Sequence, residues 1–489
     1  MKKKFLSNLI LLLFLNLLIK PFWIFGIDRT VQNIVGAEEY GFYYMLFNFS
    51  FLFNILLDFG ITNFNNRNIA QNNHLLNKHF SSIVIIKLLL AVVYTVVTFS
   101  VGLIIGFSLK QLELLGFLCF NQFLLSFILY LRSNISGLLM FRTDSFLSVL
   151  DRILMIIICG LLIWGNVTSF SFKIEWFVYA QTTAYLLTAI IALILVMFKA
   201  SFRRLKWNWP FFVMILKQSF PFAILTLLMT FYNRIDSVMI ERLLPAPKGE
   251  YEVGIYASAY RLLDAFNMIA YLFSVLLLPI FSNMIKRKEN VVQLVKLAFT
   301  LLFIVSATVA IGSHFYSFEL MELMYHDHVE ESSAVFRLLM FGFIAISSTY
   351  VFGTLLTANG SLKTLNIVAA SGMVLNLLIN LMLVPRLLAV GSAYASLFAQ
   401  YTTAVIQLIV AARLFKFKVD YRYLLTLAIF LAGLVFLNVF SKQIFENWMY
   451  NFMVMVFAAI LLAMVLKLLN IKGLIEILKT KENTLEGSS

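Results

Sequence analysis

Charged side chains are scarce in this 489-residue chain. Asp, Glu, Lys and Arg together make up 13% of the residues, whereas soluble domains carry about 25%. Hydrophobic residues reach 61%, well above the roughly 45–50% of soluble domains. This balance excludes a soluble domain of any size, and water is not the main solvent of this protein.

Several kinds of site are also missing. The chain has only two cysteines, Cys119 and Cys159, and both lie in apolar segments, which excludes a disulfide framework and a thiolate metal site. No GxxxxGK[ST] loop occurs, so an ATP-driven exporter is excluded. The cluster His326–Asp327–His328 lies in an acidic loop without HExxH spacing, so we expect no metal site. We also expect no catalytic residue and no cofactor.

Long apolar runs dominate what remains. A helix needs about 20 apolar residues to cross a bilayer, and its backbone groups must satisfy each other in lipid. A β-barrel would show short alternating segments instead. We therefore predict an all-α polytopic membrane protein. About fourteen helices are expected, at residues 5–27, 40–62, 81–107, 112–135, 145–166, 173–199, 211–240, 253–281, 291–317, 334–358, 363–384, 390–414, 421–441 and 447–467.

Two features set the predicted orientation. The first apolar run follows a basic start, MKKK, but no small-residue cleavage site follows it, so we expect a retained first helix. With that end in the cytoplasm, most Lys and Arg lie inside, and the acidic loop 318–333 lies outside. Both termini are then expected on the cytoplasmic side of the membrane. The net charge of +14 faces anionic lipid, and no nucleic acid is expected as a partner.

A short internal echo predicts two related halves. YGFYYMLF at 40–47 opens the second helix, and VGIYASAY at 253–260 opens the eighth. An even offset of six helices makes this a parallel, pseudo-two-fold repeat, and such transporters bind substrate in a central cavity between the halves. The predicted domains are an N-lobe (1–199), a basic connector (200–210), a C-lobe (211–414), two further helices (415–469) and a cytoplasmic polar tail (470–489).

Three segments carry a family resemblance. They are GAEEYGFY and LLDFGIT within residues 30–70, YNRIDSVMIERLL with EVGIYASAYRLLDAF within 232–266, and LLTANGSLKTLNIVAASGMVLNLLINLMLVPRLLAVGSAYAS at 355–396. Together they resemble the polysaccharide (Wzx-type) flippase family of the multidrug/oligosaccharidyl-lipid/polysaccharide (MOP) exporter superfamily. One departure is local: after VPRLL this chain reads AVGSAYAS, where relatives have an early Gly and a Gly-Ala-Ala run.

The resemblance implies a transporter and not an enzyme. Members of this family move undecaprenyl-pyrophosphate-linked oligosaccharide units across the inner membrane for O-antigen or capsule biosynthesis. The implied partners are that lipid-linked substrate, membrane lipids, and the polysaccharide polymerase and assembly proteins. A lipid II flippase and a cation-coupled multidrug antiporter of the same superfamily are the alternatives. A membrane glycosyltransferase or polymerase and a non-transporting scaffold are further ones.

Charges within the predicted helices are the candidate site. A pyrophosphate headgroup is anionic, so embedded cations are the first candidates for contact with it. Three are selected as substrate-binding residues: Arg261, Lys20 and Arg234. Snorkelling or an ion pair between Arg261 and Asp264 is the competing interpretation.

Embedded carboxylates are candidates for a second role. Acidic groups inside a membrane often form ion pathways, so they could bind a coupling ion or only form ion pairs. The three selected are Asp264, Asp236 and Asp58. Four further cations lie near predicted helix ends, where we expect their heads to reach the interface. These are Lys87, Arg132, Arg152 and Arg337.

Overall fold

The structure is a computed structural model that describes residues 14–16, 18–62, 65, 69, 75–138, 140–165, 172–199 and 209–469. Helices and short connections account for these residues, and no strand occurs among them, which confirms the all-α prediction. The start of the predicted first helix, most of the predicted connector and the predicted tail lie outside the described residues. The chain forms two compact units, residues 1–254 and 255–489. The predicted lobe boundaries stay a prediction.

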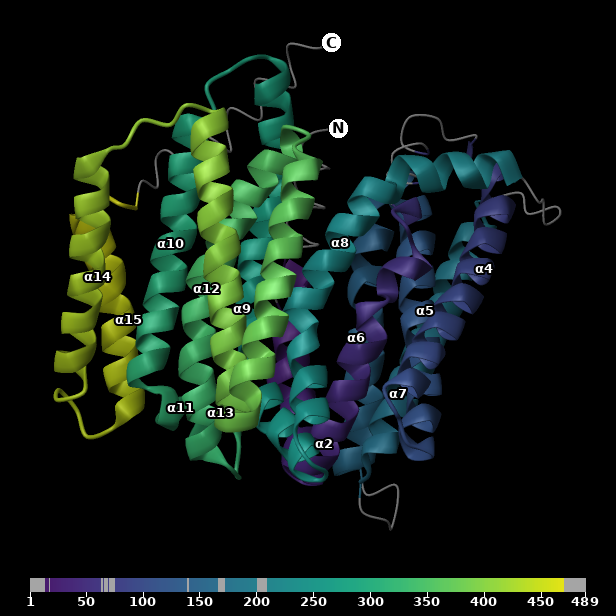
Figure 1. The fold of residues 1–489 in the computed structure, drawn as a ribbon, viewed down its shortest axis with the longest axis horizontal. Helices are drawn as coiled ribbons and strands as arrows, with labels where there is room; N and C mark the ends of the chain where they lie inside the picture. The colour runs from purple at the N-terminus through teal and green to yellow at the C-terminus, as the bar shows by residue number, and fades with distance from the viewer. Residues whose placement is uncertain are drawn as a thin grey trace. The chain divides into compact units, whose positions relative to one another are not determined.

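Unit 1 is a helical bundle whose elements follow in chain order (Figure 1). They are the π-helical turn η1 (Trp23–Asp28), α2 (Arg29–Leu52), the 3-10 turn η2 (Asn54–Leu57), α4 (Leu75–Ile104), α5 (Leu109–Gly137), α6 (Phe141–Trp164), α7 (Ile174–Met197) and α8 (Trp209–Leu243). In this unit α5 packs on α7, and α2 packs on α8. The next helix, α9 (Lys248–Lys286), begins in unit 1 and continues in unit 2.

Unit 2 is a second bundle, in which α12 packs on both α10 and α13 (Figure 1). Its elements after α9 are α10 (Val292–Phe315), α11 (Ser317–Met324), α12 (Val329–Ala358), α13 (Leu362–Leu414), α14 (Tyr421–Ser441) and α15 (Trp448–Val465). The helix α11 occupies part of the predicted outer loop 318–333, so that part of the prediction is wrong. Its Met321 is fully buried, and this burial gives a short helix a reason to form in an acidic segment.

Two long helices each bend back on themselves. In α13, Leu388 has a left-handed φ of 56°, and the Asn380 side chain accepts a hydrogen bond from Ser392 at 2.7 Å. A straight helix would hold residues twelve apart at about 18 Å, so α13 consists of two antiparallel arms, as the predicted helices 363–384 and 390–414 require. In α2, Gly36 has a positive φ of 83°, which marks a break in the helix. The first helix therefore continues to Gly36 instead of ending near residue 27 as predicted.

Many helices suit a lipid environment. Among the described residues, ten helices are long and apolar enough to cross a membrane, with both arms of α13 counted within one of them. Exposed Leu, Phe and Val side chains cover the outer faces of α14 and α15, where lipid tails are a better solvent than water. The chain is a multi-pass membrane protein. The predicted number of fourteen spans stays a prediction.

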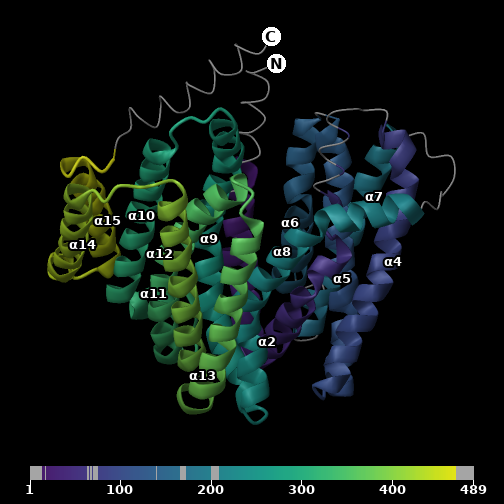
Figure 2. The same ribbon diagram turned by 45° about the horizontal axis from the view of Figure 1, so that its top comes forward.

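The last two helices form a pair beside α10 (Figures 1 and 2). Their packing centres on Phe430, Leu434 and Ala459, which are all but fully buried. Polar contacts hold both ends of α14. Lys296 of α10 pairs with Asp420 at 2.7 Å, and Tyr316 shares a hydrogen bond of 2.7 Å with Ser441. Two additional helices after the predicted C-lobe are therefore present as expected.

Candidate functional site

The six predicted site residues divide between the two units. Lys20, Asp58, Arg234 and Asp236 lie in unit 1, whereas Arg261 and Asp264 lie in unit 2. Their roles in binding substrate or ions stay predictions.

Lys20 lies on the first helix, on the side that faces α6. Asn16, one turn earlier, donates a hydrogen bond of 2.9 Å to Ser148 of α6, and residues four apart share a helix face. Lys20 is partly buried and lies within electrostatic reach of Arg132, Arg152 and Asp151. No hydrogen bond or ion pair of Lys20 is found within the described part of the chain. Its charge adds to those of Arg152 and Arg132 and is opposed by that of Asp151.

Arg152, next to Lys20, is held by several contacts within unit 1. Its Nη1 donates to the Tyr185 hydroxyl at 3.2 Å, and its Nε lies 3.7 Å from an Asp151 carboxylate oxygen. The guanidinium also lies over the Trp23 and Tyr185 rings, at 5.6 and 5.8 Å from their centroids. Trp23 in turn stacks on Phe177 at 5.7 Å. The sequence interpretation expected Arg152 to reach the interface, but the structure holds its head inside unit 1.

The charges around Lys20 leave a positive excess. Arg132 pairs with Asp144 at 2.8 Å, and Arg152 lies beside Asp151. Three cations therefore face two carboxylates, an excess of one positive charge. We call Lys20, Arg132, Arg152, Asp144 and Asp151 the unit 1 basic cluster. Sequence position alone did not indicate it, because its members come from three separate segments.

Arg234 and Asp236 lie on α8, where it packs on α2. Arg234 is partly buried and lies over the Phe51 ring, 5.6 Å from its centroid, while the Asp236 side chain is only 1% exposed. Beside them Asn48 of α2 donates a hydrogen bond of 3.0 Å to Ser237. Two-residue spacing on a helix directs side chains to different faces, in agreement with this difference in burial.

Arg261 and Asp264 occupy one side of α9 in unit 2. Both are partly buried, and the two leucines between them are buried. Their spacing of three residues places them on the same helix face. An ion pair and a substrate contact remain the two interpretations.

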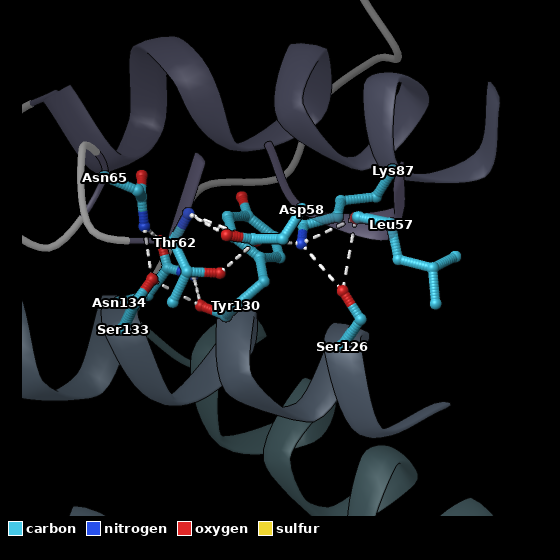
Figure 3. A network of polar contacts seen from close by, with 9 residues as sticks. All are labelled: Leu57, Asp58, Thr62, Asn65, Lys87, Ser126, Tyr130, Ser133 and Asn134. Carbon is cyan, nitrogen blue, oxygen red and sulfur yellow. Dashed lines mark hydrogen bonds and ion pairs between the residues drawn. The ribbon is translucent and has the colours of Figure 1, made fainter. Parts of the chain in front are cut away.

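Asp58 forms an ion pair with Lys87 of α4, as Figure 3 shows. The Lys87 side chain is 1% exposed, and its ammonium also donates to the Leu57 carbonyl at 3.1 Å and to the Ser126 hydroxyl of α5 at 3.0 Å. The prediction that Lys87 reaches the interface is wrong. Its ammonium group is directed inward because a carboxylate, a carbonyl and a hydroxyl accept its hydrogen bonds inside unit 1.

The chain breaks its helix at this ion pair. After η2, residues 58–60 form a turn in which Phe59 and Gly60 have positive φ values of 45° and 80°. The Asp58 carboxylate then accepts hydrogen bonds from the backbone NH and the hydroxyl of Thr62. A polar network continues to Asn65, which donates to Ser133 at 2.8 Å and to Asn134 at 3.1 Å (Figure 3).

No group of three or more metal-ligating His, Cys, Asp or Glu side chains occurs in the ranges that the structure describes. Cys119 and Cys159 are both buried and unpaired. The polar groups brought together are therefore ammonium, guanidinium, hydroxyl, amide and isolated carboxylate groups. Of these, the ammonium and guanidinium groups bind phosphate well.

The fold is similar to those of solved transporters. A structure described as lipid II flippase MurJ in an inward closed conformation covers 95% of this chain and 97% of its own, with a TM-score of 0.68 and 15% identity. A multidrug resistance MATE family transporter of the MOP superfamily, in an inward-facing conformation, covers 80% of this chain and 94% of its own, with a TM-score of 0.61 and 14% identity. A MOP superfamily transporter from Pyrococcus furiosus covers 85% of this chain and 96% of its own, with a TM-score of 0.59 and 12% identity.

At these identities the structural likeness establishes the fold of the MOP superfamily. No curated protein matches the sequence. The family described as polysaccharide biosynthesis protein matches residues 5–285, more than half of the chain and including the first two segments on which the sequence resemblance rested. With this match over more than half of its length, the chain belongs to the polysaccharide biosynthesis protein family.

Proposed function

We propose that this protein is a flippase that moves a lipid-pyrophosphate-linked oligosaccharide across the bacterial inner membrane by alternating access, for O-antigen or capsule biosynthesis. The observation that carries this proposal is the combination of a polysaccharide biosynthesis family match with the fold of a lipid flippase over 95% of the chain. The protein acts as a transporter and not as an enzyme. Both of its termini lie in the cytoplasm.

The embedded cations support a substrate that the protein recognises by an anionic headgroup. In unit 1 the basic cluster has a positive excess, and Arg152 is held by aromatic rings and a tyrosine hydroxyl, which fixes its fork of donors in place. Arginine in such a setting binds phosphate in a bidentate manner, and lysine adds a point charge. We assign the pyrophosphate contact to Lys20 and Arg152, with Arg234 and Arg261 as further contacts.

The partners follow from this assignment. The lipid tail of the substrate stays in the bilayer, and the polymerase and assembly proteins receive the flipped unit. Asp236 and Asp264 are the candidates for an ion pair or a coupling ion beside Arg234 and Arg261. Asp58 is instead paired with Lys87.

The test compares charge removal with charge conservation in the native host. The gene is deleted and complemented with wild type, Lys20→Ala, Arg152→Ala, or the conservative Lys20→Arg and Arg152→Lys, at matched membrane levels. Surface polysaccharide and lipid-linked oligosaccharide in the cytoplasmic leaflet are measured. We expect each alanine variant to lose about tenfold or more of surface polymer and to accumulate the intermediate, because a charged hydrogen bond contributes about 1.5–3 kcal/mol.

The conservative variants should retain most of the polymer, Arg152→Lys less than Lys20→Arg, because a lysine cannot replace a stacked guanidinium fork. A surface control is Lys296→Ala, whose partner Asp420 lies at the exposed start of α14. Normal polymer in the double variant Lys20→Ala/Arg152→Ala would contradict the assignment. Normal polymer in the deletion strain would contradict the function itself.

A second candidate substrate is lipid II, because the structure with a TM-score of 0.68 is named as a lipid II flippase. Both substrates carry a pyrophosphate, so the same cations would serve either one. Rescue of a strain depleted of its lipid II flippase separates them. We expect no rescue by this chain. A drug-sensitivity change in the deletion strain, with normal surface polymer, would instead favour the antiporter function of the MATE family.

A further inference from the structure

The helix break after α2 exposes a backbone carbonyl inside unit 1. The 3-10 turn η2 ends at Leu57, and the following turn continues through Gly60, so the Leu57 carbonyl makes contacts outside a regular helix. It accepts hydrogen bonds from Lys87 at 3.1 Å and from Ser126 at 3.2 Å. An unsatisfied carbonyl in the membrane is costly, so these two donors account for its position.

Three oxygen atoms surround the Lys87 ammonium. They belong to the Asp58 carboxylate, the Leu57 carbonyl and the Ser126 hydroxyl, and each comes within hydrogen-bonding distance of Nζ (Figure 3). An ammonium group has three protons and no acceptor, so three acceptors satisfy it completely. The Ser126 hydroxyl keeps its own proton for the Leu57 carbonyl. The shell thus fits a single positive charge at its centre.

The same oxygen atoms would suit a small metal cation. Carboxylate, carbonyl and hydroxyl oxygens are ligands for hard cations, and interrupted membrane helices coordinate Na⁺ through carbonyls freed by the interruption. Here the centre of the shell holds a side chain of the protein. A tethered ammonium needs no ion from solution, and it holds the break, α4 and α5 together through one group.

We propose that the shell of Asp58, the Leu57 carbonyl and Ser126 is a monovalent-cation site that Lys87 occupies permanently. Unit 1 therefore needs no bound metal ion at its helix break, and removal of the ammonium converts the shell into a Na⁺ site. This inference rests on the geometry of unit 1 and does not depend on the proposed substrate.

The different burial of Lys87 and Asp58 would allow an ion to enter the shell when the ammonium group is removed. The Lys87 side chain is 1% exposed, whereas the Asp58 side chain is 25% exposed. The Asp58 side chain is therefore partly accessible, whereas the Lys87 side chain is not. A cation that arrives at Asp58 would meet the negative charge first and would then have the carbonyl and the hydroxyl within reach.

The test uses the full-length protein purified in detergent and the variant Lys87→Met, which keeps the length of the apolar stem. The melting temperature is measured in NaCl and in choline chloride at equal ionic strength, because choline is too large for the shell. We expect wild type to melt at the same temperature in both salts. We expect Lys87→Met to melt well below wild type in choline and to recover by several degrees as Na⁺ is added, with saturation, since a ligand of the folded state raises its stability.

The matched control is Asp58→Asn/Lys87→Met, which removes both charges and leaves no carboxylate for Na⁺. We expect it to melt above Lys87→Met in choline and to show no response to Na⁺. If Lys87→Met and the control respond equally to Na⁺, or if neither responds, the proposal is wrong. A wild type that responds as strongly as Lys87→Met would also overturn it.

A second measurement covers the case in which Lys87→Met is too unstable to purify. Membranes that contain the variant are solubilised in NaCl or in choline chloride, and the monodisperse fraction is compared by size-exclusion chromatography. We expect a several-fold larger fraction in NaCl for Lys87→Met alone. An equal fraction in both salts would contradict a sodium site.

Discussion

Embedded charges in this chain differ in what holds them. Lys87 is surrounded by three oxygen acceptors, and Arg152 is held between aromatic rings and a tyrosine hydroxyl. Lys20 has neighbours of its own sign and is only partly buried. A charge that is fully satisfied within the protein stabilises the fold, whereas a cation with unused donors is available to an anion. We therefore propose a structural role for Lys87 and a substrate-binding role for Lys20.

A carboxyl group at the start of α9 gives a prediction about pH. Burial raises the pKa of Glu250 above its ordinary value of 4.5, and the charges of Glu241 and Glu38 raise it further, against Lys110 and Arg242. A raised pKa means that the folded state holds this proton more tightly than the unfolded state does. The contribution to stability is complete below pH 4.5 and is lost as the pH rises through the folded value.

Replacing Glu250 by Gln should therefore raise the melting temperature at neutral pH, by roughly 1 °C because the group is partly exposed and screened. The gain should shrink as the pH falls toward the ordinary carboxyl value and as salt increases. Thermal unfolding of the purified protein across pH measures it. Glu446→Gln, at an exposed position, is the control. A gain that is the same at every pH would contradict the electrostatic explanation.

At the scale of elements, the two echoed segments meet at their glycines within unit 1. A Cβ added to Gly41 would lie 1.8 Å from the Glu250 carbonyl oxygen, and one added to Gly254 would lie 2.0 Å from the Ala37 carbonyl oxygen. Gln32 also donates a hydrogen bond of 3.0 Å to the Gly254 carbonyl. The second residue of each echo is therefore glycine because the two backbones touch there.

Gly41→Ala should destabilise the protein at the upper end of the 1–3 kcal/mol typical of overpacking, because backbone cannot move aside as a side chain can. Gly254→Ala should act in the same direction. The control is Gly116→Ala, where the added atom would meet only the Phe99 ring at 3.7 Å. The folded fraction recovered in detergent and the melting temperature report the effect. If Gly41→Ala and Gly254→Ala gave the same folded fraction and melting temperature as Gly116→Ala, the close contact between the two backbones would not explain these glycines.

At the scale of the whole molecule, the distribution of Lys and Arg predicts which loops face the cytoplasm. Cys119 and Cys159 are buried, so cysteines introduced at exposed positions can be labelled selectively. We expect Asp327→Cys to react with a membrane-impermeant maleimide in intact spheroplasts. Arg287→Cys and Lys416→Cys should react only after the membrane is opened, because basic loops stay on the cytoplasmic side.

Labelling of Arg287→Cys in intact spheroplasts would contradict the orientation. Equal labelling of Arg287→Cys and Asp327→Cys would contradict the number of crossings between them. A background with both native cysteines replaced by serine provides the control for labelling at buried sites. This measurement tests the predicted topology independently of the transported substrate.

The sequence by itself determined the helices, because a run of about 20 apolar residues has few other structures available to it in a bilayer. The predicted helix 421–441 coincides with α14, and the predicted pair 363–384 and 390–414 matches the two arms of α13. The same reasoning failed where packing outweighs hydropathy. It ended the first helix near residue 27 and assigned the segment that forms α11 to a loop.

Only the tertiary structure decided which charges belong together. Lys87 looked like a side chain near a helix end, and its inward direction depends on Asp58, Leu57 and Ser126, which come from two other segments. The sequence predicts that Arg152 reaches the interface, because nothing in its own helix shows that Trp23 and Tyr185 will enclose it. Hydropathy depends on each segment alone, whereas an ion pair depends on the distance between segments, and that distance exists only after the helices have packed.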